Sequence, residues 1–367
     1  MSQYKPIKMI ISGGGTGGHL FPAIAIAQKV MELSPESEVM FVGALGKIEM
    51  EKVPQYGYPI EGLNIAGIQR SNMLKNLSLP GKILGSIRKS KRIVKQFKPN
   101  IAVGVGGYAS GPLLWVAERK GIPTLLQEQN SYPGITNKLL AGKAHKICVA
   151  FPGMEKFFKA KKLVLTGNPV RENLKPQSQA EALEKLGLDP NKKTILSIGG
   201  SLGARTINNA IEQRIDEIKA ANVNFIWQTG KYYVAGIKER VTNVPDNIKI
   251  SAFIDDMSTA YAAADLVISR AGALSISEIT YLSKPSILVP SPNVAEDHQT
   301  KNAMVLVNEQ AAKMVKDVDA VESLIPTALE LLNDQVELNK LSEKANGLAK
   351  RNAAQEIAEE IFKAAHA

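Results

Sequence analysis

The stretch KMIISGGGTGGHLFP (residues 8–22) decides the fold. Its first part, KMIIS (8–12), is a short apolar run typical of a buried strand, and a helix is expected from about Pro22. The glycines between them let the backbone turn sharply and leave bare N–H groups at a helix start, where a phosphate can bind. A strand, a glycine loop and a helix in this order are typical of a doubly wound α/β domain.

The spacing of Gly13, Gly15 and Gly18 also matches the dinucleotide fingerprint G-x-G-x-x-G. That fingerprint requires an acidic residue about 20 positions further on, at the tip of the second strand. The second expected strand ends VMFVGALG (39–46), without Asp or Glu at its tip. The pattern therefore disfavours NAD, and we predict no cofactor.

Expected strands alternate with helical patterns along the whole chain, as in α/β proteins. The clearest strands are expected at residues 8–12, 39–43, 101–107, 124–130 and 146–151, and then at 194–200, 224–230, 248–254, 265–272 and 286–290. We predict two Rossmann-like, doubly wound domains, residues 1–166 and 167–348, facing each other across a cleft. Ligands are expected at the carboxyl ends of the strands.

Charge is distributed unequally between the two halves. Residues 1–170 contain 19 Lys and 4 Arg against 9 Glu and no Asp, a net charge of +14, which leaves −4 for the remainder. The basic half is expected to face an anionic partner, such as nucleic acid, a phosphorylated lipid or a membrane. Aromatic residues make up only 5% of the chain and form no stacking platform, which disfavours nucleic acid.

The chain contains a single cysteine, Cys148, in the apolar run KICVA. One cysteine excludes a disulfide framework and a Cys-based metal cage, and this thiol is expected in the core. No run approaches the roughly 18 apolar residues needed to span a bilayer. We therefore expect a cytoplasmic protein that reaches a membrane only from its surface.

The glycine loop recurs at the ends of expected strands. Further loops are GVGGYASGP (104–112), GGSLGAR (199–205) and RAGALSISE (270–278). Each loop alone is equally well explained as a tight turn. Four of them on one side of the fold, with His19, Asn130, Arg171 and Gln299 also at element ends, indicate a ligand site.

These loops, together with QEQNSYPGITNK (127–138), TGNPVR (166–171), FIDDM (253–257) and EDHQTKNA (296–303), resemble the MurG-type glycosyltransferases. The resemblance implies a GT-B fold and transfer of N-acetylglucosamine from UDP-N-acetylglucosamine to an undecaprenyl-diphosphate-linked muramoyl-peptide, which forms lipid II for peptidoglycan. The basic half would hold the acceptor, the other half would hold the nucleotide sugar, and a helix within 349–367 would pack on the first domain. One departure is Gln127, where the family often has His.

The resemblance also assigns the donor side. Glu278 would accept hydrogen bonds from the ribose, although Ser275-Ile-Ser-Glu278 also fits a helix capping box. Ala273, Leu274 and Ser275 would offer N–H groups to the pyrophosphate. Further binding roles are implied for a set of polar or loop residues: Ser201 and Arg171 on the leaving UDP, Ile254 on uracil through its backbone, Gln299 and Asn130 on sugar hydroxyls, and Thr16, Gly17 and Gly18 on the donor and the acceptor diphosphate.

His19 is the candidate catalytic base. Transfer with inversion requires a group that takes the proton of the acceptor 4-hydroxyl, and imidazole titrates near neutral pH. A loop-capping or phosphate-binding histidine is equally consistent with the pattern, and Glu128 is the second candidate base. We predict no metal site, since Asp255-Asp256 is better explained as a cap of the following helix.

A basic and apolar segment, IQRSNMLKNLSLPGKILGSIRKSKR (68–92), is the candidate membrane contact. Aliphatic residues such as Leu77 and Ile83 are interspersed there with Lys75, Lys82 and Arg88, a mixture suited to an anionic lipid surface. An ordinary core helix with a solvated face fits the pattern equally well. With a lipid-linked acceptor, we expect peripheral association with the cytoplasmic face of the cell membrane.

Two other enzyme classes remain open. A diacylglycerol glucosyltransferase would share the fold and the membrane face, and a UDP-N-acetylglucosamine epimerase would share the donor without a lipid.

Overall fold

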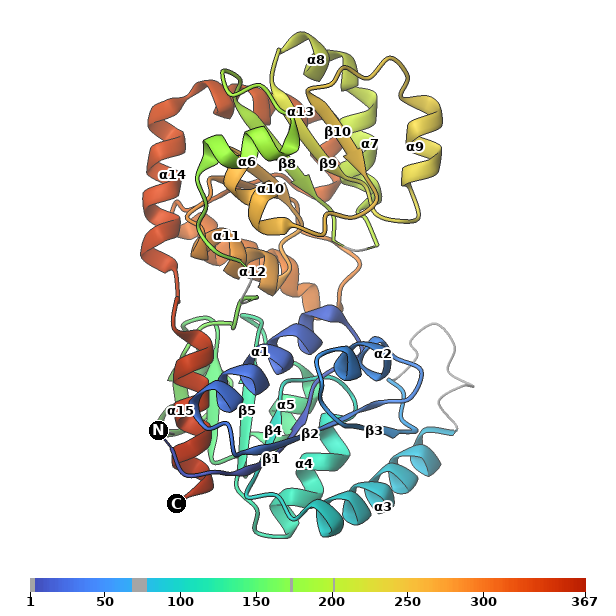
Figure 1. Ribbon diagram of the computed structural model, residues 1–367, viewed down its shortest axis with the longest axis vertical. Helices are drawn as coiled ribbons and strands as arrows, with labels where there is room; N and C mark the ends of the chain where they lie inside the picture. Colours follow the sequence, from blue (N-terminus) through green and yellow to red (C-terminus); the bar gives the residue numbers. More distant parts are fainter. Residues whose placement is uncertain (1–3, 68–77, 172–173, 201) are drawn as a thin grey trace. The chain divides into compact units, whose positions relative to one another are not determined.

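The computed structural model describes residues 4–67, 78–171, 174–200 and 202–367. The chain divides into two compact units, one formed by Met1–Arg171 with Lys350–Ala367 and the other by Glu172–Ala349 (Figure 1). Each unit has its own parallel sheet. We call them unit 1 and unit 2.

Unit 1 has a seven-stranded sheet in the order β3-β2-β1-β4-β5-β6-β7. Every strand pair that we describe in it is parallel. Its strands are β1 (Lys8–Ser12), β2 (Glu38–Ala44), β3 (Ile60–Leu63), β4 (Ile101–Gly104), β5 (Thr124–Glu128), β6 (Lys146–Val149) and β7 (Leu163–Leu165). The strand order reverses between β1 and β4, which is where doubly wound sheets bind their ligands.

Helices cover both faces of this sheet (Figure 1). One face packs against α1 (Gly17–Leu33), α2 (Ile48–Gln55) and α15 (Ala353–Ala365), and the other against α3 (Leu79–Phe97), α4 (Ser110–Arg119) and α5 (Ile135–Leu140). Phe362 of α15 is fully buried and its ring stacks on Tyr4 with 4.4 Å between centroids. The end of the chain is therefore part of the unit 1 core.

Helix α1 begins five residues before the predicted start at Pro22. Thr16 is the extended N-cap residue, with φ −146° and ψ 160°, and Pro22 lies inside the helix. Consequently Gly17, Gly18 and His19 form the first helical turn. The N–H of His19 donates to the Thr16 carbonyl at 3.2 Å, and those of Gly17 and Gly18 lie where a helix lacks acceptors of its own.

Unit 2 has a six-stranded sheet in the order β10-β9-β8-β11-β12-β13, again with parallel pairs. Its strands are β8 (Thr194–Ile198), β9 (Asn224–Gln228), β10 (Ile248–Ser251), β11 (Leu266–Ser269), β12 (Ser286–Leu288) and β13 (Lys313–Met314). Its helices are α6 (Gln179–Leu186), α7 (Arg205–Gln213), α8 (Ile215–Ala220), α9 (Val234–Arg240), α10 (Met257–Ala263), α11 (Ala273–Tyr281), α12 (His298–Asn308), α13 (Ala320–Asn333) and α14 (Gln335–Leu348). The reversal of strand order lies between β8 and β11.

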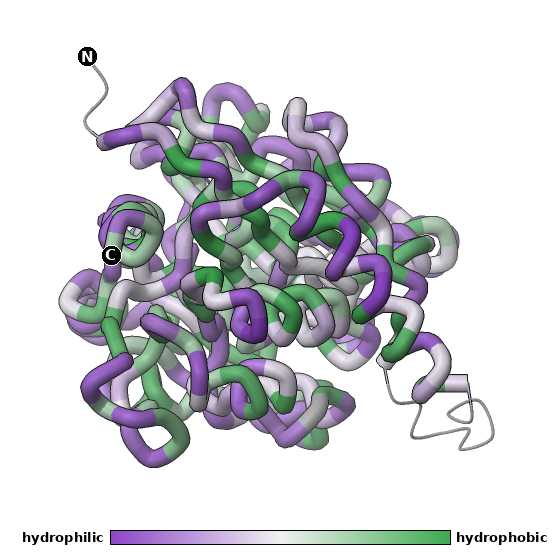
Figure 2. The backbone as a smooth tube through the Cα atoms, turned by 90° about the horizontal axis from the view of Figure 1, so that it is seen from below, coloured by the Kyte–Doolittle hydropathy of each residue, from purple (hydrophilic) through white to green (hydrophobic). Residues whose placement is uncertain are grey.

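The cores are apolar and the turns polar, as Figure 2 shows along the chain. Trp227 on β9 is completely buried in unit 2, and its indole N–H donates to Asn208 Oδ1 at 2.9 Å. A buried indole N–H needs such a partner, because burying a polar group without one is costly.

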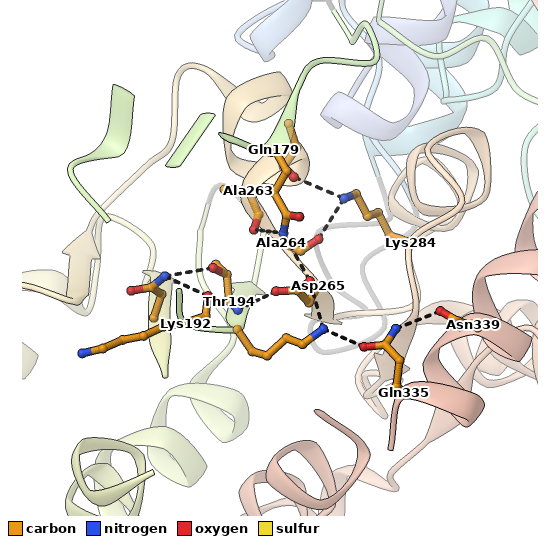
Figure 3. A network of polar contacts seen from close by, with 12 residues as sticks. Gln179, Lys192, Thr194, Ala263, Ala264, Asp265, Lys284, Gln335 and Asn339 are labelled. Carbon is orange, nitrogen blue, oxygen red and sulfur yellow. Dashed lines mark hydrogen bonds and ion pairs between the residues drawn. The ribbon is translucent and has the colours of Figure 1, made fainter. Parts of the chain in front are cut away.

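A polar network ties together the amino ends of the unit 2 strands (Figure 3). The Asp265 carboxylate accepts from the N–H of Thr194, at the start of β8, and from Gln179 Nε2 of α6. Lys284, just before β12, donates to the carbonyl of Ala264 at 2.8 Å, and burial lowers the pKa of this lysine. Because the network lies at the edge opposite the glycine loops, we assign it to stability.

In the part of the chain that we describe, none of the helices combines the length and the apolar character that crossing a bilayer requires.

Asp256 is the N-cap of α10, as the sequence analysis expected. Its Oδ1 accepts from Thr259 N at 3.1 Å, and its Oδ2 lies 2.6 Å from Lys185 Nζ. Hydrogen bonds from Lys185 and Thr259 lower the pKa of Asp256 to about 2.

We predict that Asp256→Ala lowers the free energy of unfolding of unit 2 by about 0.5–2 kcal/mol near neutral pH, the usual cost of losing an N-cap. Since the folded pKa lies below the ordinary 3.8, the stabilisation exists above that value and is lost as the pH falls towards about 2. Urea unfolding of variant and parent should therefore converge as the pH is lowered. The exposed neighbour Asp255→Ala is the control, and an equal effect of both substitutions at every pH would contradict the assignment.

Candidate functional site

Two glycine loops meet at the point in unit 1 where the strand order reverses. The first glycine loop (residues 13–18) follows β1, and the second (residues 104–112) follows β4, the neighbour of β1. Gly107 has φ +87°, and a Cβ there would lie only 2.6 Å from the carbonyl oxygen of Gly14. Backbone packs directly on backbone here, so no side chain fits between the loops.

His19 lies in the first turn of α1, on top of the second glycine loop. A Cβ on Gly106 would be 2.8 Å from His19 Nε2, so the imidazole occupies the space that the glycine leaves. The Nδ1 atom lies 3.2 Å from the Thr16 hydroxyl oxygen. The side chain is half-buried, whereas Thr16 and Gly18 are exposed. The structure thus brings Thr16, Gly17, Gly18 and His19 together at one helix start.

Glu128, the second candidate base, is engaged in holding its own loop. The side chain is 2% exposed. Its carboxylate accepts from the backbone N–H groups of Asn130 and Gly134, each at 3.0 Å, and from Asn137 Nδ2 at 2.8 Å. Burial raises the pKa of Glu128, and these hydrogen bonds act in the opposite direction. The carboxylate fixes the segment that carries Asn130, the predicted sugar ligand.

Gln127, which replaces the histidine common in the family, is completely buried. Its Nε2 donates to Asn168 Oδ1 at 2.8 Å, and its Oε1 accepts from Gln129 Nε2. Gln129 also donates to the carbonyl of Val105, which follows β4. Through the bond to Val105, this amide network holds the backbone of the second glycine loop.

Two other predicted residues of unit 1 have clear positions. Cys148 is a buried core thiol, as expected, and burial raises its pKa. Arg171 is half-buried and is the last residue of the first segment of unit 1.

Unit 2 repeats the close packing of glycine loops. The third glycine loop (residues 199–205) follows β8, and its Gly203 packs against Gly230, which follows β9. Both glycines have positive φ, 85° and 88°. Ser201, a predicted ligand of the leaving UDP, lies outside the described residues.

Gln228 connects the third glycine loop to the predicted uracil-binding residue. Its Nε2 donates to the carbonyl of Gly200 at 3.1 Å, and its Oε1 accepts from the N–H of Ile254 at 3.1 Å. The backbone of Ile254 is therefore held by β9, and its side chain is half-buried.

Helix α11 begins where the pyrophosphate was expected. Gly272 is the N-cap, and the N–H of Ile276 makes the first helical bond, to the Gly272 carbonyl. Ala273, Leu274 and Ser275 are the first three helical residues, whose N–H groups point out of the helix start. This end of α11 can accept an anion.

The capping-box explanation of Glu278 is wrong. Ser275 is the third residue of α11 instead of its N-cap, so Glu278 lies in the middle of the helix. The carboxylate is 4% exposed, and its Oε2 accepts from the Tyr261 hydroxyl at 3.2 Å. This buried carboxylate is therefore not explained by a capping box, and its ligand-binding role stays a prediction.

Gln299 is the second residue of α12, and its Oε1 accepts from the N–H of Ser291 at 2.8 Å. Its amide nitrogen is the group left for a sugar hydroxyl.

The candidate membrane segment is described only from Ser78 onward, so Lys75 and Leu77 lie outside the described residues. In α3, Ile93 and Val94 are buried, whereas Ile83 and Leu84 are 43% and 49% exposed. Arg88 is exposed and Lys82 half-buried. Lys89 instead binds the Gly62 carbonyl and Glu61 of β3. The start of α3 therefore has exposed aliphatic residues beside the positive charges of Lys82 and Arg88, and its end is core.

Among the described residues, no group of three or more His, Cys, Asp or Glu side chains is arranged to hold a metal ion.

Sequence reasoning missed three residues that organise these loops. Glu49 contacts the first glycine loop, Gln228 the third, and Arg270 binds Asp317 and the carbonyls of Val289 and Pro290 after β12. Arg270 was visible in the motif RAGALSISE but had no assigned role. Glu49 and Gln228 gave no signal in the sequence, because their partners are distant along the chain.

Comparisons with known proteins identify the family. The glycosyltransferase family 28 N-terminal domain matches residues 9–149, and the C-terminal domain of the same family matches residues 194–361. The chain is 55% identical over 98% of its length to the UDP-N-acetylglucosamine–N-acetylmuramyl-(pentapeptide) pyrophosphoryl-undecaprenol N-acetylglucosamine transferase of Phocaeicola vulgatus, covering 96% of that protein. The transferase of the same name from Bacteroides fragilis is also 55% identical, over 98% of this chain and 96% of its own length.

Among solved structures, MurG of Acinetobacter baumannii is similar over 98% of this chain and 100% of its own, with a TM-score of 0.78 and 30% identity. The two parallel sheets and the glycine loops where their strand order reverses indicate the same family as these similarities. The chain belongs to glycosyltransferase family 28 and, within it, to the MurG-type transferases with a GT-B fold.

Proposed function

We propose that this chain transfers N-acetylglucosamine from UDP-N-acetylglucosamine to the 4-hydroxyl of the muramoyl-peptide on undecaprenyl-diphosphate, forming lipid II. The observation that carries the proposal is the near-full-length identity of 55% to transferases named for this reaction. The loop geometry of both units supports it, since each sheet presents helix N-termini suited to a diphosphate.

Unit 2 would bind the donor. The N–H groups at the start of α11 face the pyrophosphate, Glu278 accepts from the ribose hydroxyls, and Ile254 meets uracil through its backbone. Because the Ile254 N–H is bonded to Gln228, its carbonyl is the group offered first to the base. Ser201 and Arg171 would stabilise the charge that develops as UDP leaves, and Gln299 would bind the sugar.

Unit 1 would bind the acceptor and supply the base. The acceptor 4-hydroxyl oxygen attacks the anomeric carbon on the face opposite UDP, the bond from that carbon to the diphosphate breaks, and the hydroxyl proton passes to His19. For Nε2 to take this proton, Nδ1 must carry its own, which the Thr16 hydroxyl oxygen can accept at 3.2 Å. Thr16, Gly17 and Gly18 then bind the acceptor diphosphate, and Asn130 binds sugar hydroxyls.

The beginning of α3 would contact the cytoplasmic face of the membrane. Ile83 and Leu84 would enter the lipid interface, and Lys82 and Arg88 would bind anionic headgroups. The excess positive charge of residues 1–170 favours the same surface.

The function is tested by incubating the purified protein with UDP-N-acetylglucosamine and lipid I and measuring the molecular mass of the product. We expect lipid I to gain one N-acetylhexosamine. Glycosylated diacylglycerol, or an epimerised donor without any acceptor, would instead support one of the two other enzyme classes.

Replacing Glu278 with Gln should lower kcat/KM for the donor by an amount equivalent to about 1–3 kcal/mol, the cost of a charge-assisted hydrogen bond. Steady-state kinetics with varied donor measures this change. Glu322→Gln, an exposed glutamate of the same unit, is the control and should have parental kinetics. Unchanged donor kinetics in a folded Glu278→Gln protein would contradict the ribose-binding role and leave the carboxylate with a structural role, which includes its contact with Tyr261.

His19→Ala should reduce kcat by about 10²–10⁴-fold, since a general base typically contributes that much. Binding of UDP, measured by calorimetry, should stay at the parental level, because His19 is not among the residues proposed to bind UDP and all of those except Arg171 belong to unit 2. A small loss of kcat would indicate that a group other than His19 takes the proton. A loss of UDP binding with normal turnover at saturation would contradict the assignment of the donor to unit 2.

For the membrane contact, Ile83→Asp with Leu84→Asp should abolish the vesicle binding that persists at high salt, because apolar insertion does not depend on screening. Lys82→Gln with Arg88→Gln should weaken binding at low salt by about 1 kcal/mol per charge. Sedimentation with anionic vesicles measures both. Val336→Asp, at a more exposed aliphatic site in unit 2, should have no effect. Binding that is indifferent to all four α3 substitutions would exclude α3 as the contact.

A further inference from the structure

Glu49 is a buried carboxylate that the proposed mechanism does not use. It is the second residue of α2, and its side chain is 1% exposed. A charged group is rarely buried to this extent unless hydrogen-bond partners compensate for the lost water. The partners of Glu49 should therefore explain why it is there.

Both carboxylate oxygens accept a backbone N–H. Oε2 accepts from Gly15 at 2.8 Å, and Oε1 accepts from Ala44, the last residue of β2, at 3.0 Å. The side chain thus connects the first glycine loop to the end of the neighbouring strand. Its position in the first turn of α2 also favours a negative charge.

Two glycines make room for this side chain. A Cβ on Gly43 would lie 2.5 Å from Glu49 Cγ, and a Cβ on Gly14 would overlap the carboxylate carbon. Neither glycine has a positive φ, in contrast to Gly15 at +84°. Backbone conformation therefore does not require glycine at positions 14 and 43, whereas the space occupied by Glu49 does.

The contact determines which N–H groups the loop can offer to a ligand. The Gly15 N–H is directed inward to Glu49, so an anion at this loop meets the start of α1 instead. The next residue is Thr16, whose hydroxyl contacts His19. A shift of Gly15 would move Thr16 and with it the imidazole.

We propose that Glu49 is a positioning residue for the transfer reaction. By holding the N–H groups of Gly15 and Ala44, it fixes the first glycine loop in the shape that orients Thr16 and His19 and directs the acceptor diphosphate to the start of α1. This inference rests on the proposed function, in which unit 1 binds the acceptor.

The test is Glu49→Gln, which keeps the shape but can accept only one of the two N–H groups. We expect kcat to fall at least 10-fold and KM for lipid I to rise, with KM for UDP-N-acetylglucosamine unchanged. Glu49→Asp, which keeps the charge but is one methylene shorter, should show the same pattern. Glu38→Gln, at the exposed opposite end of β2, is the matched control and should have parental kinetics.

Hydrogen exchange gives a readout that does not depend on activity. In Glu49→Gln the amides of Gly15 and Ala44 should exchange faster, while the peptide spanning residues 199–205 should exchange as in the parent. A double-mutant cycle of Gly43→Ala and Glu49→Ala adds a steric test. Gly43→Ala alone should lower the free energy of unfolding. It should lower it much less once Glu49→Ala has removed the clash.

Each outcome has a distinct meaning. Parental kinetics in the Glu49 variants, with only a lower melting temperature, would overturn the positioning role and leave a structural one. An equal rise in both KM values would also overturn it. Failure of the unmodified protein to glycosylate lipid I would instead reject the proposed function, and the exchange and double-mutant results would still decide whether Glu49 holds the loop.

Discussion

The arrangement of unit 1 depends on the contact between backbone and backbone at the end of β1 and β4. A Cβ on Gly107 would lie 2.6 Å from the Gly14 carbonyl oxygen, so the two loops touch only because neither has a side chain there. The close contact of the two loops places the His19 ring on Gly106 and leaves the start of α1 exposed. A helix start beside an imidazole is suited to a phosphorylated substrate whose hydroxyl must lose a proton.

Unit 2 uses the same principle for a different purpose. Its loops also pack glycine on glycine, at Gly203 and Gly230, but no histidine lies in them. Instead the start of α11 and the buried Glu278 offer a place for an anion and an acceptor for hydroxyl groups. The two units therefore differ in chemistry while sharing a topology: unit 1 is basic and has an imidazole at the start of α1, and unit 2 has the buried Glu278 carboxylate in α11.

Periodicity and glycine placement were sufficient to predict two doubly wound α/β domains and the positions of the four loops. They predicted less well where a helix begins: α1 starts at Gly17 instead of about Pro22, and Thr16, whose backbone is extended, is its N-cap residue. The same kind of error made Ser275 look like a cap, although α11 starts at Ala273. Local sequence signals identify caps only when no other residue nearby can cap the helix.

Contacts between distant segments could not be predicted in this way. Glu49 reaches Gly15 across 34 positions, and Gln228 connects Gly200 to Ile254. Such residues follow from which strands are neighbours, a fact that the sequence pattern of one element does not contain. The roles of individual site residues came from the resemblance to the MurG-type enzymes, and the structure adds how Thr16, His19, Glu128 and Glu278 are held.

The central claim is that unit 1 binds the acceptor and unit 2 the nucleotide sugar. Hydrogen exchange of the unmodified protein, with UDP alone and with a short soluble lipid I analogue alone, tests it directly. We expect UDP to protect residues 250–256 and 270–278 and to leave 13–19 and 104–108 unchanged, and the analogue to do the reverse. Protection of the first glycine loop by UDP, without any change at the start of α11, would contradict the account.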